Sequence, residues 1–423
     1  MNVLVFGAGG FLGSHVVHEL QRQDRYHIFA AVRSAGTAAF DTERTTVLEG
    51  DLLDPDYVRD AVKDKDVVIF TAGRTWSPGL DVSEYGRINV GITKIFFEVI
   101  KDRPDLRVVF TSSTATVGGT AKPVVLDEQD ARGGVVEDGL NPYDYAKIEC
   151  EEIALRHSAQ GGNVVILNPG ILLGPSAIPG AKLPAPLVVL LVCLQKCPFY
   201  VNARVAFSDV RDVADAHVKA IEHGQSGCRY LVVSHNLYRR DFYTRLTELT
   251  GTPRPWRLPH QVVTMSSVFT DTLSLVTKGI VKSPVHRHFA RTQKLHYCGD
   301  SQRAINEIGF NATPIEDTII DTVRQYVELD MLPDRYRILK HAGTSNTIPL
   351  VCLYQMALRH PRRRFLLPQF QKIYQTCRSN QNLDAALTTL AANSSVRYST
   401  GRYRLGQRKH RHEMEVIDRF FDY

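Results

Sequence analysis

The sequence predicts an α/β fold built on a doubly wound parallel sheet with helices on both of its faces. Short apolar runs rich in β-branched residues alternate with amphipathic stretches through the first 170 residues. The run Val67–Phe70 is apolar at every position, which is typical of a strand that is buried on both faces. A glycine-rich turn directly after the first apolar run is the third observation, and it also predicts where a ligand binds.

The expected elements follow one another in a regular order. Because helical stretches separate the strands, the connections cross over the faces of the sheet, which makes the strands parallel. We expect helices at residues 11–21, 57–62, 92–101 and 143–157, and strands at residues 3–6, 28–32, 47–48, 67–70, 108–111 and 164–167.

The pattern becomes less regular after Pro169. A proline-rich stretch at 174–186 is expected to leave the sheet, and the apolar run at 187–194 is expected to be a buried helix, because a bilayer span needs about 20 residues. A helix at 210–223 and a strand at 230–233 then resume the alternation. We assign residues 1–170 to a dinucleotide-binding domain to which residues 205–235 return, residues 171–204 and 236–335 to a smaller, mostly helical substrate lobe, and residues 336–423 to a basic C-terminal extension.

The charge of the chain is unevenly distributed. The net charge is +6, and residues 340–423 hold 14 Lys and Arg against 5 Asp and Glu, which leaves −3 for residues 1–339. A basic extension attracts polyanions. We therefore expect a polyanion or a larger assembly to contact the extension. The other expected partners are a small-molecule substrate and a second copy of the chain in a homodimer.

The cysteines and the start of the chain bear on the compartment. Seven cysteines are scattered with no Cys-x-x-Cys pair, which indicates free thiols and predicts no zinc or other metal site. Met1 and Asn2 lead directly into an apolar strand, without the regions of a signal peptide, and no apolar run is long enough to cross a membrane. We therefore expect a cytoplasmic protein.

The glycine-rich turn has the context that a dinucleotide site needs. It follows the first strand and begins the first helix. A first glycine allows the tight turn, a middle glycine lets backbone amides approach a pyrophosphate, and a last glycine lets the helix pack on the strand, with its positive end towards the phosphates. The sequence therefore predicts a Rossmann-type fold, with cofactor contacts from Gly7-Ala8-Gly9-Gly10-Phe11-Leu12-Gly13.

The end of the second strand indicates which nicotinamide cofactor binds. An acidic residue there would hydrogen-bond the ribose 2′-hydroxyl of NAD, but Val32 occupies the place and Arg33 follows. The forked guanidinium of Arg33 suits a 2′-phosphate, which favours NADP and leaves NAD as the alternative. Asp51 and Leu52, after the third strand, are expected near the adenine.

A tyrosine and a lysine mark the reacting end. Tyr143 and Lys147 are four residues apart on one predicted helix face. A tyrosine has a pKa of about 10, and a nearby ammonium group would lower that value into the range of a useful acid and base. Hydroxyl groups at the end of the fifth strand could polarise a substrate oxygen, with Ser113 as the first choice and Ser112 or Thr114 as alternatives.

These motifs together resemble the extended short-chain dehydrogenase/reductases, the NAD(P)-dependent epimerase/dehydratase superfamily. Within it, the chain is most similar to the dihydroflavonol-reductase and 3-beta-hydroxysteroid-dehydrogenase branch. The resemblance covers residues 1–335 and includes the glycine-rich turn, Gly50-Asp51-Leu52, Thr71-Ala72-Gly73, Asn89-Val90-Gly91, Phe110 to Ser113, Tyr143 to Lys147, Asn168-Pro169-Gly170 and Asp209 to His217.

The resemblance implies a role for each matching residue. Tyr143 would be the general acid and base, Lys147 would bind the ribose and lower the pKa of the tyrosine, and Ser113 would polarise the carbonyl. Asn89 would support the backbone near the cofactor. Further cofactor contacts would come from Ser112, Thr71, Ala72, Gly73, Pro169 and Gly170. Ala146 replaces the serine that the family usually has before the lysine.

Three functions remain open at this stage. The first is an NADP(H)-dependent oxidoreductase that interconverts a ketone and a secondary alcohol on a small hydrophobic, steroid- or flavonoid-like substrate. The second is a nucleotide-sugar epimerase or dehydratase that keeps NAD bound. The third is a nucleotide-binding scaffold or redox sensor that docks through the basic extension, because a fold does not fix a function.

Overall fold

The computed structural model describes residues 1–34, 43–75, 82–130, 141–177, 187–276, 292–329 and 331–332. The basic C-terminal extension expected at 336–423 lies outside these residues. In the described part, no helix combines the length and the apolar character that a membrane span requires.

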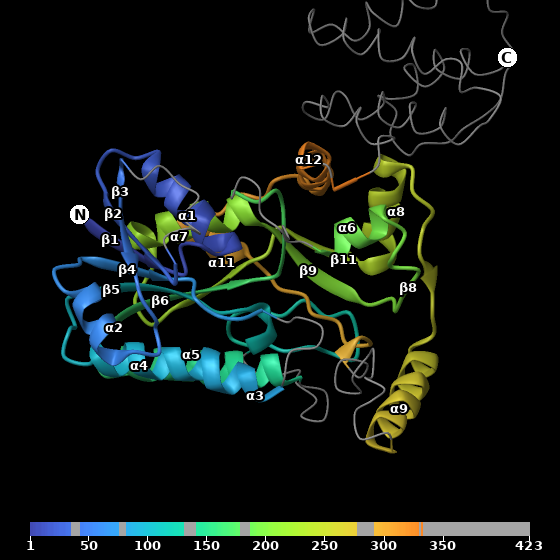
Figure 1. The fold of residues 1–423 in the computed structure, drawn as a ribbon, viewed down its shortest axis with the longest axis horizontal. Coiled ribbons are helices and arrows are strands. Elements are labelled where there is room, and N and C mark those ends of the chain that lie inside the picture. Colours follow the sequence, from blue (N-terminus) through green and yellow to red (C-terminus); the bar gives the residue numbers. More distant parts are fainter. Residues whose placement is uncertain are drawn as a thin grey trace, which may run out of the picture.

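A seven-stranded parallel sheet forms the centre of the molecule (Figure 1). Its strand order is β10-β6-β5-β4-β1-β2-β3. The chain adds strands outward from β1 to β3 on one side, and then returns to the centre and adds strands outward from β4 on the other side, so the order of addition reverses between β1 and β4. A reversal of this kind opens a crevice at the carboxyl ends of the two strands, where ligands bind in such sheets. The fold class predicted from the sequence is confirmed. The strands are β1 (Asn2–Phe6), β2 (His27–Val32), β3 (Thr45–Glu49), β4 (Val67–Phe70), β5 (Arg107–Thr111), β6 (Asn163–Pro169) and β10 (Arg229–Val232).

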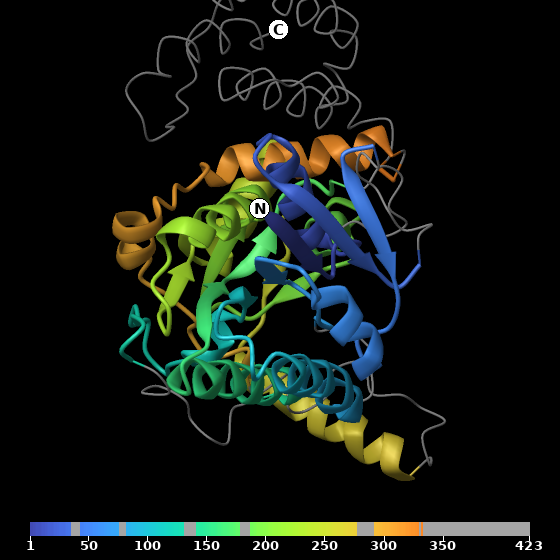
Figure 2. The same cartoon turned by 90° about the vertical axis from the view of Figure 1, so that its left-hand side faces the viewer.

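Helices cover both faces of this sheet. α1 (Phe11–Gln21) and α7 (Val210–His223) lie on one face, and α2 (Pro55–Val62), α4 (Gly91–Val99) and α5 (Pro142–Ala159) lie on the other (Figure 2). α3 (Val82–Tyr85) and a short π-helix, Gly86–Val90, lead into α4. The predicted helices at 11–21 and 210–223 have the bounds that the structure shows.

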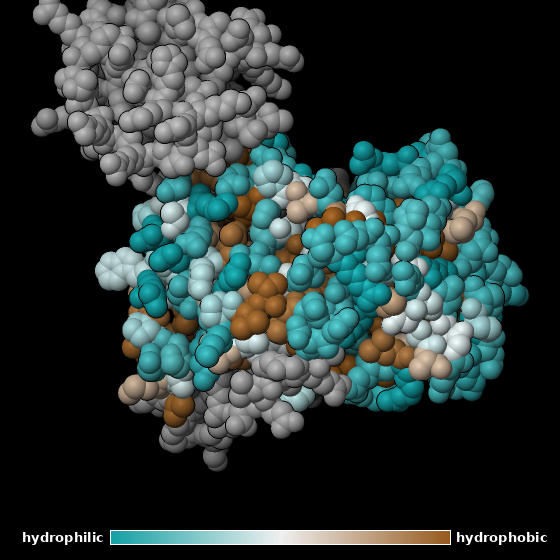
Figure 3. Space-filling view, turned by 180° about the vertical axis from the view of Figure 1, so that it is seen from behind, coloured by the Kyte–Doolittle hydropathy of each residue, from teal (hydrophilic) through white to brown (hydrophobic). Residues whose placement is uncertain are grey.

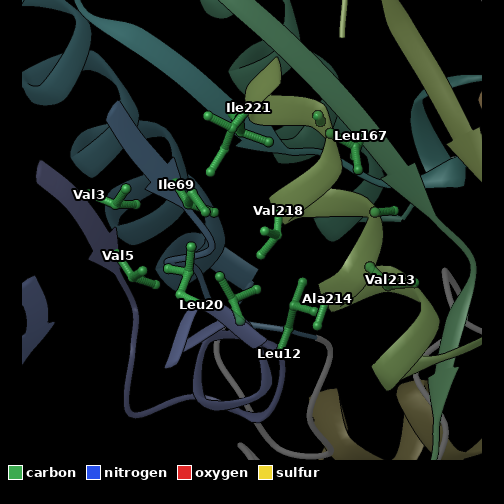
Figure 4. Packing of buried hydrophobic residues seen from close by; sticks show 14 of the residues in the cluster. Val3, Val5, Leu12, Leu20, Ile69, Leu167, Val213, Ala214, Val218 and Ile221 are labelled. Carbon is green, nitrogen blue, oxygen red and sulfur yellow. The ribbon is translucent and has the colours of Figure 1, made fainter. Parts of the chain in front are cut away.

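Alternate side chains of β1 fill two separate cores, because successive residues of a strand point to opposite faces. Val3 and Val5 face Leu12 and Leu20 of α1 and also contact the cluster formed by α7 (Figure 4). Leu4 and Phe6 are buried on the other side, where Phe6 packs edge-on against Phe96 of α4 with ring centroids 5.8 Å apart. This double burial explains why the strands read as continuous apolar runs.

The second part of the molecule is a lobe with its own sheet. Three strands pair in the order β11-β9-β7, and their core is closed by α6, α8 and α12. Residues 205–209, expected at the start of the return to the dinucleotide-binding domain, lie in β9, the central strand of the sheet of the lobe. The elements are β7 (Ile171–Leu173), α6 (Leu187–Cys193), β8 (Phe199–Tyr200), β9 (Arg204–Asp209), β11 (His235–Tyr238), α8 (Arg239–Thr250), β12 (Trp256–Arg257), α9 (His260–Val276), α11 (Gln302–Ile308) and α12 (Ile315–Glu328).

The apolar run at 187–194 forms α6, a buried helix as predicted. Val189 and Cys193 are fully buried, and Val192 is 1% exposed. The helix therefore serves the core of the lobe. From behind, hydrophilic residues dominate the described surface, with apolar patches between them (Figure 3).

Candidate active site

The glycine-rich turn joins β1 to α1 at the crevice. Gly7 has φ +82°, in the left-handed region that favours glycine, and Gly10 N donates to Gly7 O at 2.9 Å. A Cβ on Gly13 would lie 2.1 Å from Gly7 O, so the last glycine allows the helix to approach the turn. Gly10 is the N-cap of α1 and offers no side-chain cap, which leaves the first-turn amides and the positive helix end for an anion. This cradle fits a dinucleotide pyrophosphate.

The expected adenine contacts lie along the same edge of the sheet. Gly50 N donates to Val32 O at 3.1 Å, which brings the ends of β2 and β3 together. Arg33 and Asp51 are both exposed at these ends. Asp51 Oδ1 accepts from the backbone amide of Leu53 at 3.0 Å, which stabilises the turn that holds it. An exposed guanidinium beside a dinucleotide edge is accessible to a 2′-phosphate.

Side chains also hold the backbone beside the crevice. Asn89 accepts from Arg74 N at 2.7 Å and donates to Arg74 O at 3.0 Å, so it fixes the backbone after β4. Gly170 N donates to Ser208 Oγ at 3.0 Å, and a Cβ on Gly170 would lie 2.6 Å from Ala206 O. Thr71 Oγ1 donates to Phe6 O at 2.8 Å. These predicted contact residues therefore line up where the strands β1, β4 and β6 end.

Ser113 and Tyr143 meet at the reacting end. Ser113 follows β5 and is the N-cap of a short 3-10 helix, Thr114–Thr116, while Tyr143 lies in the first turn of α5. The Ser113 side chain lies near the Tyr143 phenol. Burial raises the pKa of Tyr143, and the neighbouring Ser113 hydroxyl acts in the opposite direction. The ring of Tyr85 packs edge-on against Tyr143, with centroids 6.0 Å apart.

Lys147 lies one helical turn beyond the tyrosine. Its Nζ donates to Thr111 O at 3.0 Å. Burial lowers the pKa of Lys147, and the neighbouring Cys150 and Glu151 oppose that change. The sequence-based expectation was that Lys147 would lower the pKa of Tyr143, but the net direction for Tyr143 is upward because burial is the largest influence. The lysine is bonded to the end of β5, where it can still reach a ribose.

A buried carboxylate organises the residues around Ser113. Glu151 is 4% exposed, accepts from Thr116 Oγ1 at 2.7 Å and from Asn168 Nδ2 at 2.6 Å, and is also bonded to the Ser112 hydroxyl. Asn168 Nδ2 also donates to Ser113 O at 3.1 Å, and the Thr116 hydroxyl, whose one hydrogen can serve either acceptor, lies 2.9 Å from the same carbonyl oxygen. The network therefore fixes the backbone of Ser113 and engages the hydroxyl of Ser112, which favours Ser113 over Ser112 as the group that faces a substrate.

Sequence reasoning missed this network. Glu151 pairs with Arg229 of β10 at 3.2 Å, and both side chains are nearly buried. The available signal was its spacing, because a residue four positions after Lys147 shares the helix face of that lysine. Among the described residues, no cluster of His, Cys, Asp and Glu could hold a metal ion.

Comparison with known proteins identifies the family. The sequence profile described as the NAD dependent epimerase/dehydratase family matches residues 3–232. The chain belongs to this family. It is therefore an NAD(P)-dependent oxidoreductase of the short-chain dehydrogenase/reductase type, and the resemblance predicted from the motifs is confirmed.

Individual relatives match most of the chain. Sterol demethylase protein B of Methylococcus capsulatus is 27% identical over 345 residues, which covers 78% of this chain and 100% of that protein. Cinnamoyl-CoA reductase 1 of Petunia hybrida is 26% identical over 346 residues, which covers 78% of this chain and 93% of that protein. The fold is similar to that of UDP-glucuronic acid 4-epimerase from Bacillus cereus in complex with UDP-glucuronic acid and NAD, with a TM-score of 0.60, 18% identity, and coverage of 78% of this chain and 100% of that one.

Proposed function

We propose that this epimerase/dehydratase-family protein is an NADP(H)-dependent reductase that interconverts a carbonyl group and an alcohol on a small, largely hydrophobic substrate. The observation that carries the proposal is that Ser113, which follows β5, and Tyr143, in the first turn of α5, lie near each other, with Lys147 one turn away and bonded to the end of β5. Relatives named as a cinnamoyl-CoA reductase and a sterol-modifying protein support a substrate with a large apolar part.

The residues of the chain divide the work. The Ser113 hydroxyl would hold the carbonyl oxygen and stabilise the negative charge that develops there. Tyr143 would donate its phenolic proton to that oxygen during reduction, and would take the proton back in the reverse direction. Lys147 would hold ribose hydroxyls, and its positive charge would offset the effect of burial on the tyrosine. A bound nicotinamide would supply or accept the hydride.

The cofactor is proposed to be NADP(H). Arg33 is exposed at the end of β2, where the residue before it is Val32 rather than an acid. A 2′-phosphate could accept a charge-assisted, forked hydrogen bond from the guanidinium. The turn from Gly7 to Gly13 would hold the pyrophosphate.

The buried residues of α6 fill the core of the lobe, so they are not available to contact a substrate. The apolar sequence of this helix therefore gives no support for a hydrophobic ligand. The proposal of a hydrophobic substrate therefore depends on the relatives. An epimerase acting on a nucleotide sugar is the second candidate, because the fold is shared with such enzymes.

A substrate panel tests the proposal. Purified protein would be mixed with NADPH or NADH and with aromatic aldehydes, ketosteroids, dihydroflavonols, cinnamoyl-CoA or UDP-glucose, and oxidation of the cofactor would be followed at 340 nm. We expect carbonyl reduction that prefers NADPH, and loss of turnover in Tyr143→Phe with cofactor binding retained. UDP-glucose epimerised without net cofactor oxidation would favour the second candidate, and near-wild-type kcat in Tyr143→Phe would refute the assigned mechanism.

A further inference from the structure

Arg239, the first residue of α8, is held rigidly in the substrate lobe. Its backbone N donates to Ala203 O at 3.0 Å. Its side chain is only partly exposed, and Nη1 donates to Val201 O at 3.2 Å and to Gln293 O at 2.9 Å. The two carbonyls use both hydrogens of Nη1. The guanidinium is therefore fixed in position and orientation by backbone atoms from two different segments.

The opposite edge of this guanidinium is available. In the described part of the chain, Nε and Nη2 of Arg239 have no hydrogen-bond partner, and no carboxylate forms an ion pair with the side chain. Nε–H and Nη2–H point in parallel and form the fork that binds carboxylates and phosphates through two hydrogen bonds. A partly buried arginine without a counter-ion is unfavourable unless an anion arrives to pair with it.

The groups immediately around Arg239 are phenols, a histidine and a second arginine, and the Asp144 carboxylate lies beyond the Tyr297 hydroxyl. The ionisable groups that influence it are the phenols of Tyr243 and Tyr297. His296 and Arg204 lie nearby: Arg204 N donates to His296 Nδ1 at 2.8 Å, and burial lowers the pKa of His296, with Arg239 and Arg204 adding to that effect. A local excess of positive charge attracts an anion from solvent and disfavours a neutral ligand at this place.

This arginine belongs to the side of the lobe that faces the reacting end. The hydroxyl of Tyr297 donates to Asp144 Oδ2 at 3.3 Å, and Asp144 follows Tyr143 directly in α5. Tyr297 therefore links the surroundings of Arg239 to the helix that carries the general acid.

We propose that Arg239 binds an anionic group, a carboxylate or a phosphate, at the end of the substrate remote from the reacting carbonyl. This inference rests on the proposed function, because it names the substrate class of the same site. An anion site at Arg239 would distinguish between the two substrate classes that the relatives' names suggest. A coenzyme A thioester carries phosphates, whereas a sterol carries no acidic group. Substrates with an acidic end are therefore preferred over neutral ones.

The test compares Arg239→Met with a matched control on the next residue. Methionine keeps the length of the apolar stem and removes the charge. Arg240 is exposed and its Nε contacts Asp241 Oδ1 at 3.0 Å, so Arg240→Met removes a neighbouring charge outside the proposed fork. Each protein, with NADPH present, would be titrated by calorimetry with coenzyme A as the phosphate probe, cinnamate as the carboxylate probe and cinnamyl alcohol as the neutral probe, and its melting temperature would be recorded.

The expected result is a loss that depends on the charge of the probe. Wild type should bind at least one anionic probe more tightly than the alcohol, and Arg239→Met should weaken that probe about 10- to 100-fold while leaving the alcohol unchanged. Arg240→Met should bind all three probes as wild type does, and Arg239→Lys should keep part of the affinity for the anion. The preferred anion decides between phosphate and carboxylate.

Three results would overturn the proposal: equal binding of anions and alcohol by wild type, equal losses for all probes in Arg239→Met, or the same loss in Arg240→Met. If Arg239→Met does not fold, Arg239→Lys supplies the comparison. Failure of the proposed function is distinguishable, because wild type and the control Arg240→Met should both reduce a neutral aromatic aldehyde, whatever binds at Arg239. If neither protein reduces the aldehyde, the proposed reductase function is wrong, and the binding titrations still decide whether Arg239 binds an anion.

Discussion

Asp144→Asn offers a quantitative test of the electrostatics beside the reacting tyrosine. Asp144 is 3% exposed in the first turn of α5, where its carboxylate accepts from Asn141 N and from the Tyr297 hydroxyl, both at 3.3 Å. Despite these bonds, burial raises the pKa of Asp144 from 3.8 to about 6, because the charged form has lost its water. Ionised Asp144 therefore destabilises the folded protein.

The size of the effect follows from the difference in pKa. A change from 3.8 to about 6 corresponds to about 3 kcal/mol, at 1.36 kcal/mol for each pKa unit. Since the folded state binds the proton more tightly than the unfolded state, this contribution to stability is fully present below pH 3.8 and is lost as the pH rises through about 6. Asparagine is neutral throughout, so the free energy of unfolding of Asp144→Asn should rise relative to wild type between pH 4 and pH 8, by at most about 3 kcal/mol.

Urea unfolding across that pH range measures the difference. Asn141 N and the Tyr297 hydroxyl both donate to Oδ2 of Asp144, so the amide oxygen of an asparagine in the same place can accept from both donors. Asp56, which is exposed in the first turn of α2, provides the control. A gap between Asp144→Asn and wild type that stays constant or shrinks as the pH rises would refute the reasoning.

Three further substitutions test the cofactor site. Gly13→Ala would place a Cβ 2.1 Å from Gly7 O, so we expect at least a 10-fold loss of nucleotide affinity in a fluorescence titration, and unchanged affinity would contradict the cradle. Arg33→Asp should reverse the preference for NADP over NAD, with a change of about 10- to 100-fold in the ratio of dissociation constants, and equal affinities in wild type would remove its basis. Lys147→Ala should impair both turnover and cofactor binding. An effect on the melting temperature alone would mean that Lys147 has only a structural role, through its hydrogen bond to Thr111 O.

The sheet and its helices were predictable because burial on two faces leaves a strong trace in the sequence. Val3 and Leu4 face opposite cores, so neither position tolerates a polar residue, and the run is visible without any structure. β9 was harder to place. No strand was predicted at Arg204–Asp209, which mixes apolar and polar residues, and its partners β7 and β11 are separated from it along the chain. Strand pairing is a long-range property that local pattern does not contain.

The candidate site was predictable where a single residue type is required by chemistry or by backbone conformation. Gly7 has a positive φ, and Tyr143 carries a proton that phenylalanine lacks. Glu151 and Arg239 leave no such trace, because a glutamate in a helix and an arginine at a helix start are both commonplace on surfaces. Their meaning comes from what surrounds them once the chain has folded.

Glu151 and Arg239 also show how burial gives a charged residue its role. Glu151 is enclosed, yet Thr116, Asn168 and Arg229 supply hydrogen bonds and an opposite charge, so the carboxylate is satisfied within the fold and acts on the backbone of Ser113. Arg239 has comparable restraint on one edge, from two backbone carbonyls, but no opposite charge on the other edge in the described chain. A buried charge whose hydrogen bonds and opposite charge both come from the protein supports the structure. A buried charge that has only some of its hydrogen bonds and no opposite charge is stabilised when an anionic ligand binds. On that distinction, we expect Glu151 to position Ser113, and Arg239 to bind the anionic end of the proposed substrate.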